Sequence, residues 1–308
     1  MTELNFNKLG WGDAEAEQLA MVLPLCAQLS KLTLTDNQLG PEGARMLATA
    51  VRVNTVLTLV QLDGRALPVK QLMGTEPVTW LDLSYEQLGD ASAILIGKLL
   101  EVNSTLTELR LQFNNIGPNG AQALAEAVRV NKVIKSLDLY NNAVGPEGAQ
   151  ALAAALRVNT NLTFFNASGN DIGDAGAIAI AGALKKVSTA LSELWLGGNS
   201  IGADGAQALA DSLRVNTALK SLVLDGNDFG LAGATALADA LRVNVAMAKL
   251  GINANSIGNE GALAIADALK THKSMENVYL GLYNNIDKPT KKKLKEVGAV
   301  REALKFHF

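Results

Sequence analysis

The chain has 308 residues, a formal net charge of −3 and a single cysteine, Cys26. The small negative charge argues against a general binder of nucleic acid or of anionic membranes, because such proteins concentrate basic residues on one face. One cysteine excludes an internal disulfide and fits a reducing compartment. No secretory signal is visible at the N-terminus, and no apolar run approaches the ~20 residues that span a bilayer, so we expect a cytoplasmic location.

Residues 1–31 resemble the units that follow but are irregular. A short strand is expected around Leu4, and a helix from about Asp13 to Leu29, with Pro24 inside it. End units of repetitive folds must cover the core with a more polar outer face. We therefore interpret residues 1–31 as an N-terminal capping repeat.

Residues 137–159 show the repeating unit in its clearest form. Leu137 and Leu139 alternate with polar residues and predict a very short strand, after which Asn and Gly turn the chain. Pro146 suits the first position of a helix, and apolar residues then follow at spacings of three and four. Asn159 can adopt the left-handed conformation that ends a helix.

The unit recurs along the whole chain with a fixed period. The steps between equivalent strand residues are 28 residues in all but two cases, where they are 21 and 29. Such a period is typical of a solenoid, in which each unit buries its apolar face against its neighbours. The first core residue of each predicted strand is Leu4, Leu32, Val60, Leu81, Leu109, Leu137, Phe165, Leu194, Leu222, Leu250 and Val278.

Each repeat supplies one strand and one return helix, so successive strands should be parallel and each crossover right-handed. Helices need about 10 Å and strands about 4.8 Å, so stacked units should curve into a horseshoe with strands on the concave face and helices on the convex face. We expect one α/β domain over residues 1–308, with about 11 repeats. Repeats at 32–277 would lie between the N-terminal cap and a C-terminal strand and capping helix at 278–308.

The unit that begins at Val60 is irregular. Arg65 replaces the turn Asn, Pro68 replaces the Gly, and residues 69–77 leave room for only one or two helical turns. In the next turn, Glu86 stands where Asn is expected. The short repeat at 60–80 fits either a tolerated short connection or a change of curvature that marks a contact site.

The chain ends with a basic segment followed by an amphipathic pattern. Apolar residues recur at helical spacing at Leu294, Val297, Val300 and Leu304, which predicts a capping helix. A solvated charged face accounts for the lysines on the other side. The lysines are Lys288, Lys291, Lys292, Lys293 and Lys295.

The strand segments LRLQFNNIG (109–117), LDLYNNAVG (137–145) and LVLDGNDFG (222–230), with helices such as GPEGAQALAAALRVN (145–159), resemble leucine-rich repeats of the ribonuclease-inhibitor class. The resemblance covers essentially the whole chain and implies a leucine-rich-repeat solenoid. That class includes ribonuclease inhibitor, the sensor ends of NLR proteins, activators of the Ran GTPase and regulators of the actin cytoskeleton.

The sequence offers no residues for an active site. The two histidines, His272 and His307, and the lone Cys26 cannot supply a catalytic triad or a metal cluster, and no phosphate-binding glycine motif is present. We therefore predict a protein that is not an enzyme and has no metal or cofactor. The recurring asparagines are expected to satisfy backbone groups of neighbouring turns. They are Asn37, Asn114, Asn142, Asn170, Asn199, Asn227 and Asn255.

Aromatic residues concentrate on the predicted concave face. Positions at offsets −1, +1, +3 and +4 from the strand anchors number about 44, so about two of the 14 aromatic residues would fall there by chance. Seven do, and six of them come from five consecutive strands. The seven are Trp80, Tyr85, Phe113, Tyr140, Phe164, Trp195 and Tyr279.

Exposed aromatic and arginine side chains with a charged rim are the composition of a recognition surface. We predict binding of a partner protein or peptide through Trp80, Tyr85, Arg110, Phe113, Tyr140, Phe164 and Trp195. The residues expected to set specificity are Asp82, Glu108, Asp138 and Glu193, and Asn166 lies among them. The rings could also stack on one another only to cover the sheet, and those at +4 could fold into the turn.

Two other functions are implied by the resemblance. The chain could regulate a small GTPase, in the manner of a GTPase activator, although its lysine-rich end differs from the acidic tail of the Ran GTPase activators. It could also be the sensor part of an NLR-like protein. Self-association through the aromatic face is a further possibility.

Overall fold

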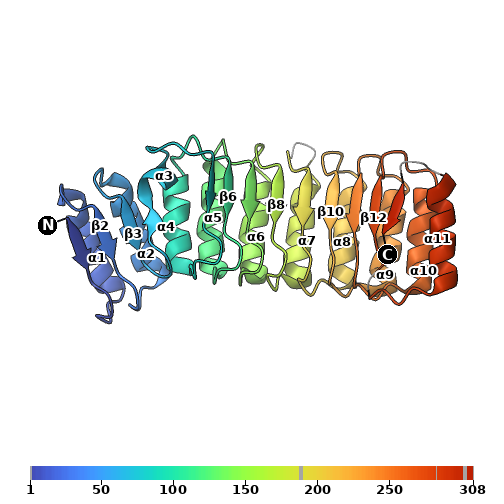
Figure 1. Cartoon of the computed structure of the whole chain (residues 1–308), viewed down its shortest axis with the longest axis horizontal. Coiled ribbons are helices and arrows are strands. Elements are labelled where there is room, and N and C mark those ends of the chain that lie inside the picture. The colour runs from blue at the N-terminus through green and yellow to red at the C-terminus, as the bar shows by residue number, and fades with distance from the viewer. Residues whose placement is uncertain (1, 187–189, 282, 301–303, 308) are drawn as a thin grey trace. The chain divides into compact units, whose positions relative to one another are not determined.

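The computed structural model describes residues 2–186, 190–281, 283–300 and 304–307. The chain forms two compact units, Met1–Val144 and Gly145–Phe308, which are treated separately below. Each unit consists of a layer of short strands and a layer of helices (Figure 1). The single-domain organisation and the horseshoe stay predictions.

The first unit holds two groups of strands. Strands β1, β2 and β3 are parallel, β4 pairs antiparallel with β3, and β5, β6 and β7 form a separate parallel run. The elements are β1 (Glu3–Asn5), α1 (Asp13–Val22), η1 (Leu23–Leu25), β2 (Lys31–Thr33), α2 (Pro41–Val53), β3 (Leu59–Gln61), β4 (Leu67–Pro68), α3 (Val69–Met73), β5 (Trp80–Asp82), α4 (Asp90–Leu100), β6 (Glu108–Arg110), α5 (Pro118–Val130) and β7 (Ser136–Asp138).

The second unit is more regular, and its strands follow one another in chain order. The printed pairings from β8 to β13 are all parallel. The elements are α6 (Gly145–Leu156), β8 (Phe164–Asn166), α7 (Gly173–Leu184), β9 (Glu193–Trp195), α8 (Ala203–Leu213), β10 (Ser221–Val223), α9 (Gly230–Leu241), β11 (Lys249–Gly251), α10 (Gly258–Leu269), β12 (Asn277–Tyr279), α11 (Lys288–Val300) and β13 (Lys305–His307).

These elements confirm an α/β leucine-rich-repeat solenoid. Every predicted anchor is the central residue of a strand, and anchors one repeat apart are paired in register, as Leu194 is with Leu222 and Leu222 with Leu250. Most anchors are fully buried beneath the helices. Leu81 is only partly buried, because β5 pairs with β6 and with no preceding strand of the described chain.

The turn asparagines hold one repeat to the next. Asn114 donates its Nδ2 hydrogens to the carbonyls of Leu83 and Leu111, at 2.8 and 2.9 Å, and its Oδ1 accepts the N–H groups of Glu86 and Leu88. Asn227 makes the equivalent four bonds in the second unit. The structural role predicted for these asparagines is therefore confirmed.

A second set of asparagines closes the other end of each repeat, and the left-handed conformation predicted for Asn159 is wrong. Asn159 is absent from the residues with positive φ, and the equivalent Asn131 has φ −67° and ψ 134°. The side chain satisfies the backbone instead: Asn159 Oδ1 accepts two N–H groups at 2.8 Å, from Asn161 and Leu162. His272 occupies the same place, and its Nδ1 accepts the N–H of Met275.

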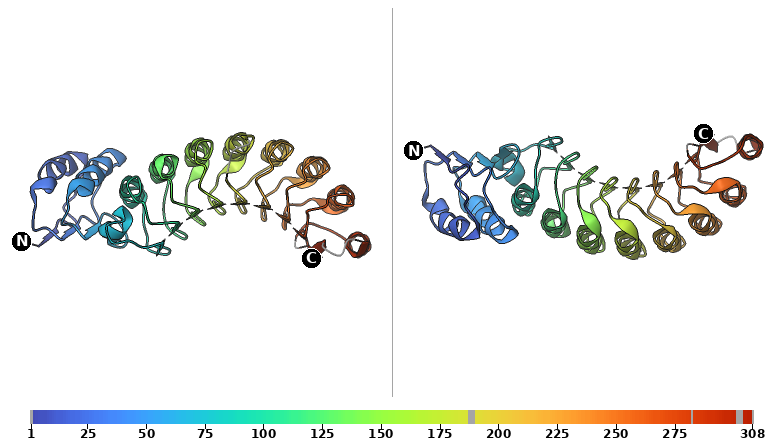
Figure 2. Two further views of the ribbon diagram at one scale, coloured as in Figure 1. Left: turned by 90° about the horizontal axis from the view of Figure 1, so that it is seen from above. Right: turned by 90° about the horizontal axis from the view of Figure 1, so that it is seen from below.

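The irregular repeat departs from the parallel pattern. After β3, a tight turn at Gly64 (φ +37°) returns the chain as β4, which runs antiparallel to β3 rather than parallel as expected. The five-residue helix α3 lies in the row of strands, apart from the longer helices (Figure 2). Helix α2 consequently packs directly against α4, and Arg52 pairs with Glu101 at 2.7 Å between them.

The two ends differ from the sequence prediction. Helix α1 ends at Val22, seven residues before the expected Leu29, because Pro24 enforces a 3₁₀ turn. At the other end, the predicted capping helix stops at Val300, whose side chain lies outside the described part, and β13 follows it. The central residue of β13, Phe306, pairs with Val278, 28 residues earlier. The repeat period therefore continues into a segment for which the sequence predicts only a helix.

The buried asparagines make a stability prediction. Asn244 is 4% exposed; its Nδ2 donates to the carbonyls of Leu213 and Asn216 at 2.7 and 2.9 Å, and its Oδ1 accepts the N–H groups of Ala246 and Met247. Asn244→Ala leaves these groups without partners and should lower the free energy of unfolding by about 3 kcal/mol. Urea unfolding measures the change.

The control for this prediction is Asn119→Ala, whose side chain is exposed in the first turn of α5. It should shift the unfolding midpoint little. Equal shifts for the two variants would contradict the role of Asn244.

Candidate functional site

Three aromatic rings form a continuous row on the strand side of the first unit. Tyr85 stacks on Phe113, with ring centres 4.3 Å apart and an interplanar angle of 12°, and Phe113 meets Tyr140 edge to face at 4.9 Å. Tyr85 is 69% exposed and Tyr140 38%. This aromatic row therefore presents apolar area to solvent while the rings hold one another in place.

Two rings of the aromatic row stand on strained backbone. Tyr85 and Phe113 have φ of +60° and +53°, in the left-handed region. The equivalent turn positions in the second unit include Gly169, Gly198 and Gly226, which adopt this conformation without steric cost. A residue with a side chain costs ~1–2 kcal/mol there. The same turn position carries Lys8, Asp36, Asn141 and Ala254 in other repeats, also with positive φ, so the left-handed conformation belongs to the repeat and not to the rings alone.

A charged cluster lies beside the aromatic row. The guanidinium carbon of Arg110 is 5.8 Å from the centre of the Trp80 ring, which is 58% exposed. Arg110 also pairs with Glu108 at 2.6 Å and lies 4.0 Å from Asp82. A hydrogen bond from the Ser84 side chain, aided by the Ser84 N–H and the Arg110 charge, holds the pKa of Asp82 below its usual value.

Asp138 connects the strands below the rings. One carboxylate oxygen accepts the N–H of Tyr140 at 2.9 Å, and the other accepts Nε2 of Gln112 at 2.9 Å. The Ser84 hydroxyl, which lies beside Asp82, also contacts Oε1 of Gln112. The predicted specificity residue Asp138 therefore also orients the turn that carries Tyr140.

The strand side of the second unit carries a separate group of rings. Phe164 meets the Trp195 ring edge to face, with centres 5.3 Å apart. The ammonium of Lys249 lies 5.8 Å from the Trp195 ring centre and 5.4 Å from that of Tyr279. Tyr279 stacks on His307 at 4.3 Å. One lysine thus bridges two aromatic side chains.

Between these rings the surface is hollowed. Gly251 carries no side chain between Val223 and Tyr279, and the resulting hollow has a volume of about 290 Å³. Trp195 and Tyr279 line it, with Lys249 and Asp225 as its charged groups. Burial raises the pKa of Asp225, although hydrogen bonds from Asn253 and the charge of Lys249 act in the opposite direction.

The structure places most predicted residues on the expected strand side, where their part in binding stays a prediction. Glu193 is exposed at the start of β9, on the row of Lys249. Asn166 does not belong to the surface, because it is 4% exposed and its Oδ1 accepts the Ser168 N–H. The sequence prediction left out Lys249 and His307. Lys249 lies at offset −1 from the strand anchor Leu250, and His307 lies 28 residues after Tyr279, so the repeat period leads to it.

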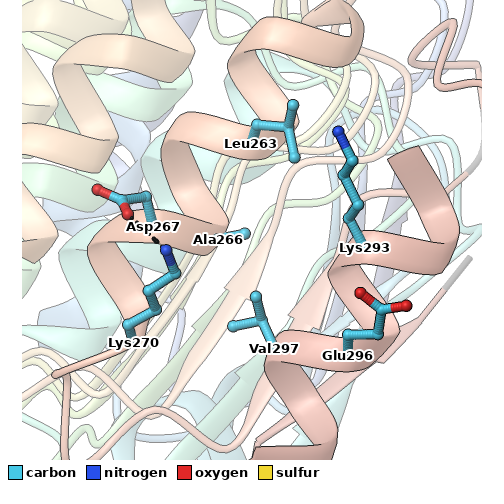
Figure 3. Close-up of a pocket in the computed structure, with 7 residues that line it drawn as sticks. All are labelled: Leu263, Ala266, Asp267, Lys270, Lys293, Glu296 and Val297. Atoms are coloured by element: carbon cyan, nitrogen blue, oxygen red, sulfur yellow. Dashed lines mark hydrogen bonds and ion pairs between the residues drawn. The ribbon is translucent and has the colours of Figure 1, made fainter. Parts of the chain in front are cut away.

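A larger pocket lies on the helix side of the second unit, between α10 and α11 (Figure 3). Its volume is about 500 Å³, and Leu263, Ala266 and Val297 provide its apolar lining. Asp267 at its rim is paired with Lys270 and Arg242, each at 2.9 Å. Lys293 and Glu296 complete the lining, so this pocket combines apolar walls with charged residues at its rim.

Catalytic and metal chemistry find no support among the described residues. No group of three or more His, Cys, Asp or Glu side chains in that part of the chain could hold a metal ion. His272 is buried in its structural role and His307 stacks on a tyrosine. None of the described helices combines the length and apolar character needed to cross a bilayer.

Comparison with known proteins identifies the repeats. The leucine-rich-repeat family model matches six segments that together make up a little under half of the chain. These matches and the alternation of strand and helix support a leucine-rich-repeat fold; the ribonuclease-inhibitor class and the GTPase-regulator and NLR readings stay predictions. The matched residues are 26–48, 102–125, 130–153, 158–181, 187–210 and 215–238.

Two solved structures are similar at the level of the fold. Actin-Binding Site 2 of Leiomodin-1 is 20% identical, with a TM-score of 0.42 over 51% of this chain and 90% of that one. The tropomodulin C-terminal domain of Caenorhabditis elegans is 14% identical, with a TM-score of 0.42 over 48% and 90%. Neither likeness is close enough to bear on function. No match was found among curated proteins.

The buried carboxyl of the hollow makes a pH prediction. A raised folded-state pKa means that Asp225 costs stability as pH rises from its ordinary value of 3.8 through the folded pKa. Asp225→Asn removes this cost and still accepts the Asn253 N–H, but its NH2 group replaces the oxygen that accepts Asn253 Nδ2, so the longer hydrogen bond of 3.3 Å is lost. The variant should therefore gain thermal stability over wild type at neutral pH, and the gain should shrink near pH 4.

Melting curves at the two pH values measure this difference. The exposed Asp228→Asn in the same unit is the control and should show no such trend. A gain for Asp225→Asn that is the same at both pH values would contradict desolvation as the cause.

Proposed function

We propose that this leucine-rich-repeat protein is a non-enzymatic scaffold that binds a partner protein or peptide on the strand side of its repeats. The observation that carries the proposal is the exposed aromatic row. Tyr85, Phe113 and Tyr140 hold one another in place and still present apolar area to solvent. Exposed aromatic area of this kind is typical of binding surfaces.

The composition of the surface supports the same function. Trp, Tyr and Arg dominate binding hot spots, and charged residues at the rim favour specificity and rapid association. In the first unit the proposed anchors are Trp80, Tyr85, Arg110, Phe113 and Tyr140, with Asp82, Glu108 and Asp138 at the rim. In the second unit they are Phe164 and Trp195, with Glu193 at the rim.

The ion pairs within the surface are compatible with this role. Arg110 already pairs with Glu108, so a partner would meet a pre-oriented guanidinium rather than a mobile one. Holding the side chain before binding reduces the entropy lost on association. The Trp80 ring below it would supply the apolar part of the contact.

The proposal predicts that binding and stability can be separated at the aromatic row. Replacing Tyr85 and Phe113 with glycine removes two stacked rings but relieves two left-handed side chains, so the free energy of unfolding should change by less than ~1 kcal/mol. Partner affinity should nevertheless fall by more than tenfold, or about 1.4 kcal/mol. Affinity capture from a lysate of the source cells, followed by titration of the captured partner, measures the loss.

Trp195→Ala and Tyr140→Ala should each weaken the same complex by more than ~1 kcal/mol. Leu231→Ala is the matched control, because Leu231 is 43% exposed on α9 in the helix layer. If every strand-side variant captured the same partners with unchanged affinity, the strand side would be excluded as the binding surface. Loss of partners in the Leu231→Ala control as well would point to the helix side.

A further inference from the structure

The hollow in the second unit contains a cation that no described carboxylate contacts. Within the described residues the Lys249 ammonium forms no ion pair or hydrogen bond, although its charge acts on Asp225, and it lies 5.8 and 5.4 Å from the ring centres of Trp195 and Tyr279. It lines the hollow and is only partly exposed. The ammonium therefore has donor capacity that the surrounding protein leaves unused.

The other charge of the hollow is already engaged. Asp225 Oδ1 accepts the Asn253 N–H at 2.8 Å and Oδ2 accepts the Asn253 Nδ2 at 3.3 Å. Its burial disfavours the charged form of this carboxyl. An incoming cation would have to compete with Lys249 for the rings and for Asp225, whereas an incoming anion meets an ammonium that has no hydrogen-bond acceptor among the described residues.

The shape of the hollow adds an apolar requirement. Gly251 forms the low point between Val223 and the Tyr279 ring, and the Trp195 ring closes the opposite side. A Cβ on Gly251 would lie 3.0 Å from Asp225 Oδ1 and 3.2 Å from Val223 Cγ1, so the space depends on the absence of that side chain. A methylene chain fits against these walls better than a fully hydrated ion does.

We propose that the hollow formed by Trp195, Val223, Gly251 and Tyr279 binds an acidic side chain of the partner, glutamate in preference to aspartate. The methylenes lie against Val223 and the open Cα of Gly251, and the carboxylate accepts hydrogen bonds from the Lys249 ammonium between the rings. This assignment rests on the proposed binding function and names the chemistry that the second unit recognises. The charge of Asp225 repels a carboxylate placed deeper in the hollow, so the acidic side chain of the partner stays on the Lys249 side.

The test uses capped pentapeptides with alanine on both sides of a central glutamate, glutamine or lysine. The isotope-labelled full chain has three tryptophans, Trp11, Trp80 and Trp195, so its indole N–H signals report on separate places. The glutamate peptide should shift the Trp195 signal with a dissociation constant on the order of 1 mM. The glutamine peptide should bind at least about tenfold more weakly, because it lacks the charge-assisted hydrogen bond.

Two variants locate the interaction. Lys249→Met keeps the aliphatic stem and should weaken the glutamate peptide by about tenfold, and Gly251→Ala should weaken it by filling the hollow. The control is Lys220→Met, which removes an exposed lysine of the same unit outside the hollow. Melting curves confirm that each variant is folded.

Several outcomes would overturn the assignment. Equal binding of the glutamate and glutamine peptides would show that the hollow makes only apolar contacts with the peptide side chain. Preference for the lysine peptide would make the hollow a cation-binding site. No shift of the Trp195 signal at a peptide concentration of about 10 mM, tenfold above the expected constant, would exclude the acid altogether. Unchanged binding by Lys249→Met would remove the lysine from the site.

Failure here is distinguishable from failure of the proposed function. If partner capture depends on Tyr85, Phe113 and Trp195 while Lys249→Met leaves it unchanged, the strand side binds a partner but the hollow does not take an acid. If the peptide binds as expected while no strand-side variant affects capture, the acid site exists without supporting the wider proposal.

Discussion

Hydrogen bonding of the backbone at the two ends of each short strand is the constraint on which this structure depends. A three-residue strand leaves most turn N–H and C=O groups to be satisfied elsewhere, and buried groups without partners are costly. Buried asparagines such as Asn114 and Asn244 provide these bonds. Asn114 accepts amides of the preceding repeat and donates to carbonyls of that repeat and its own, and Asn244 joins carbonyls of the preceding repeat to the amides that follow it. The repeats can therefore stack closely while the strand-side residues remain free to vary.

The exceptions to this bonding show how the chain tolerates change. At the irregular repeat both turn asparagines are replaced, and Arg65 pairs with Glu86 at 2.6 Å while the Arg65 N–H donates to the Glu86 carbonyl. The ion pair joins the turns in place of an amide. At the C-terminal end His272 substitutes for the equivalent asparagine through Nδ1. An ion pair or an imidazole acceptor can thus stand where the regular repeats place an asparagine.

The same use of residues for packing and hydrogen bonding limits where a binding function can lie. Core and turn positions are committed to packing and hydrogen bonding, which leaves the short strand rows and the residues just after them. In the first unit these rows carry stacked rings on left-handed backbone, and in the second they carry Lys249 between two rings beside a hollow. Both arrangements place aromatic rings beside charged side chains at the surface, which is the physical basis for assigning them to binding.

The sequence by itself determined the period, the strand anchors, the parallel order of the regular repeats and the structural role of the turn asparagines, because each follows from local spacing. It also located the strand-side rings. The prediction from sequence was wrong where contacts between residues far apart in the chain determine the local structure. Strand β4 turns back on β3, Asn166 is buried, and β13 forms because Phe306 pairs with Val278. The stacking of Tyr85 on Phe113 and the position of Lys249 between two rings were decided only by the tertiary structure, since side chains 28 or more residues apart meet only once the repeats are stacked.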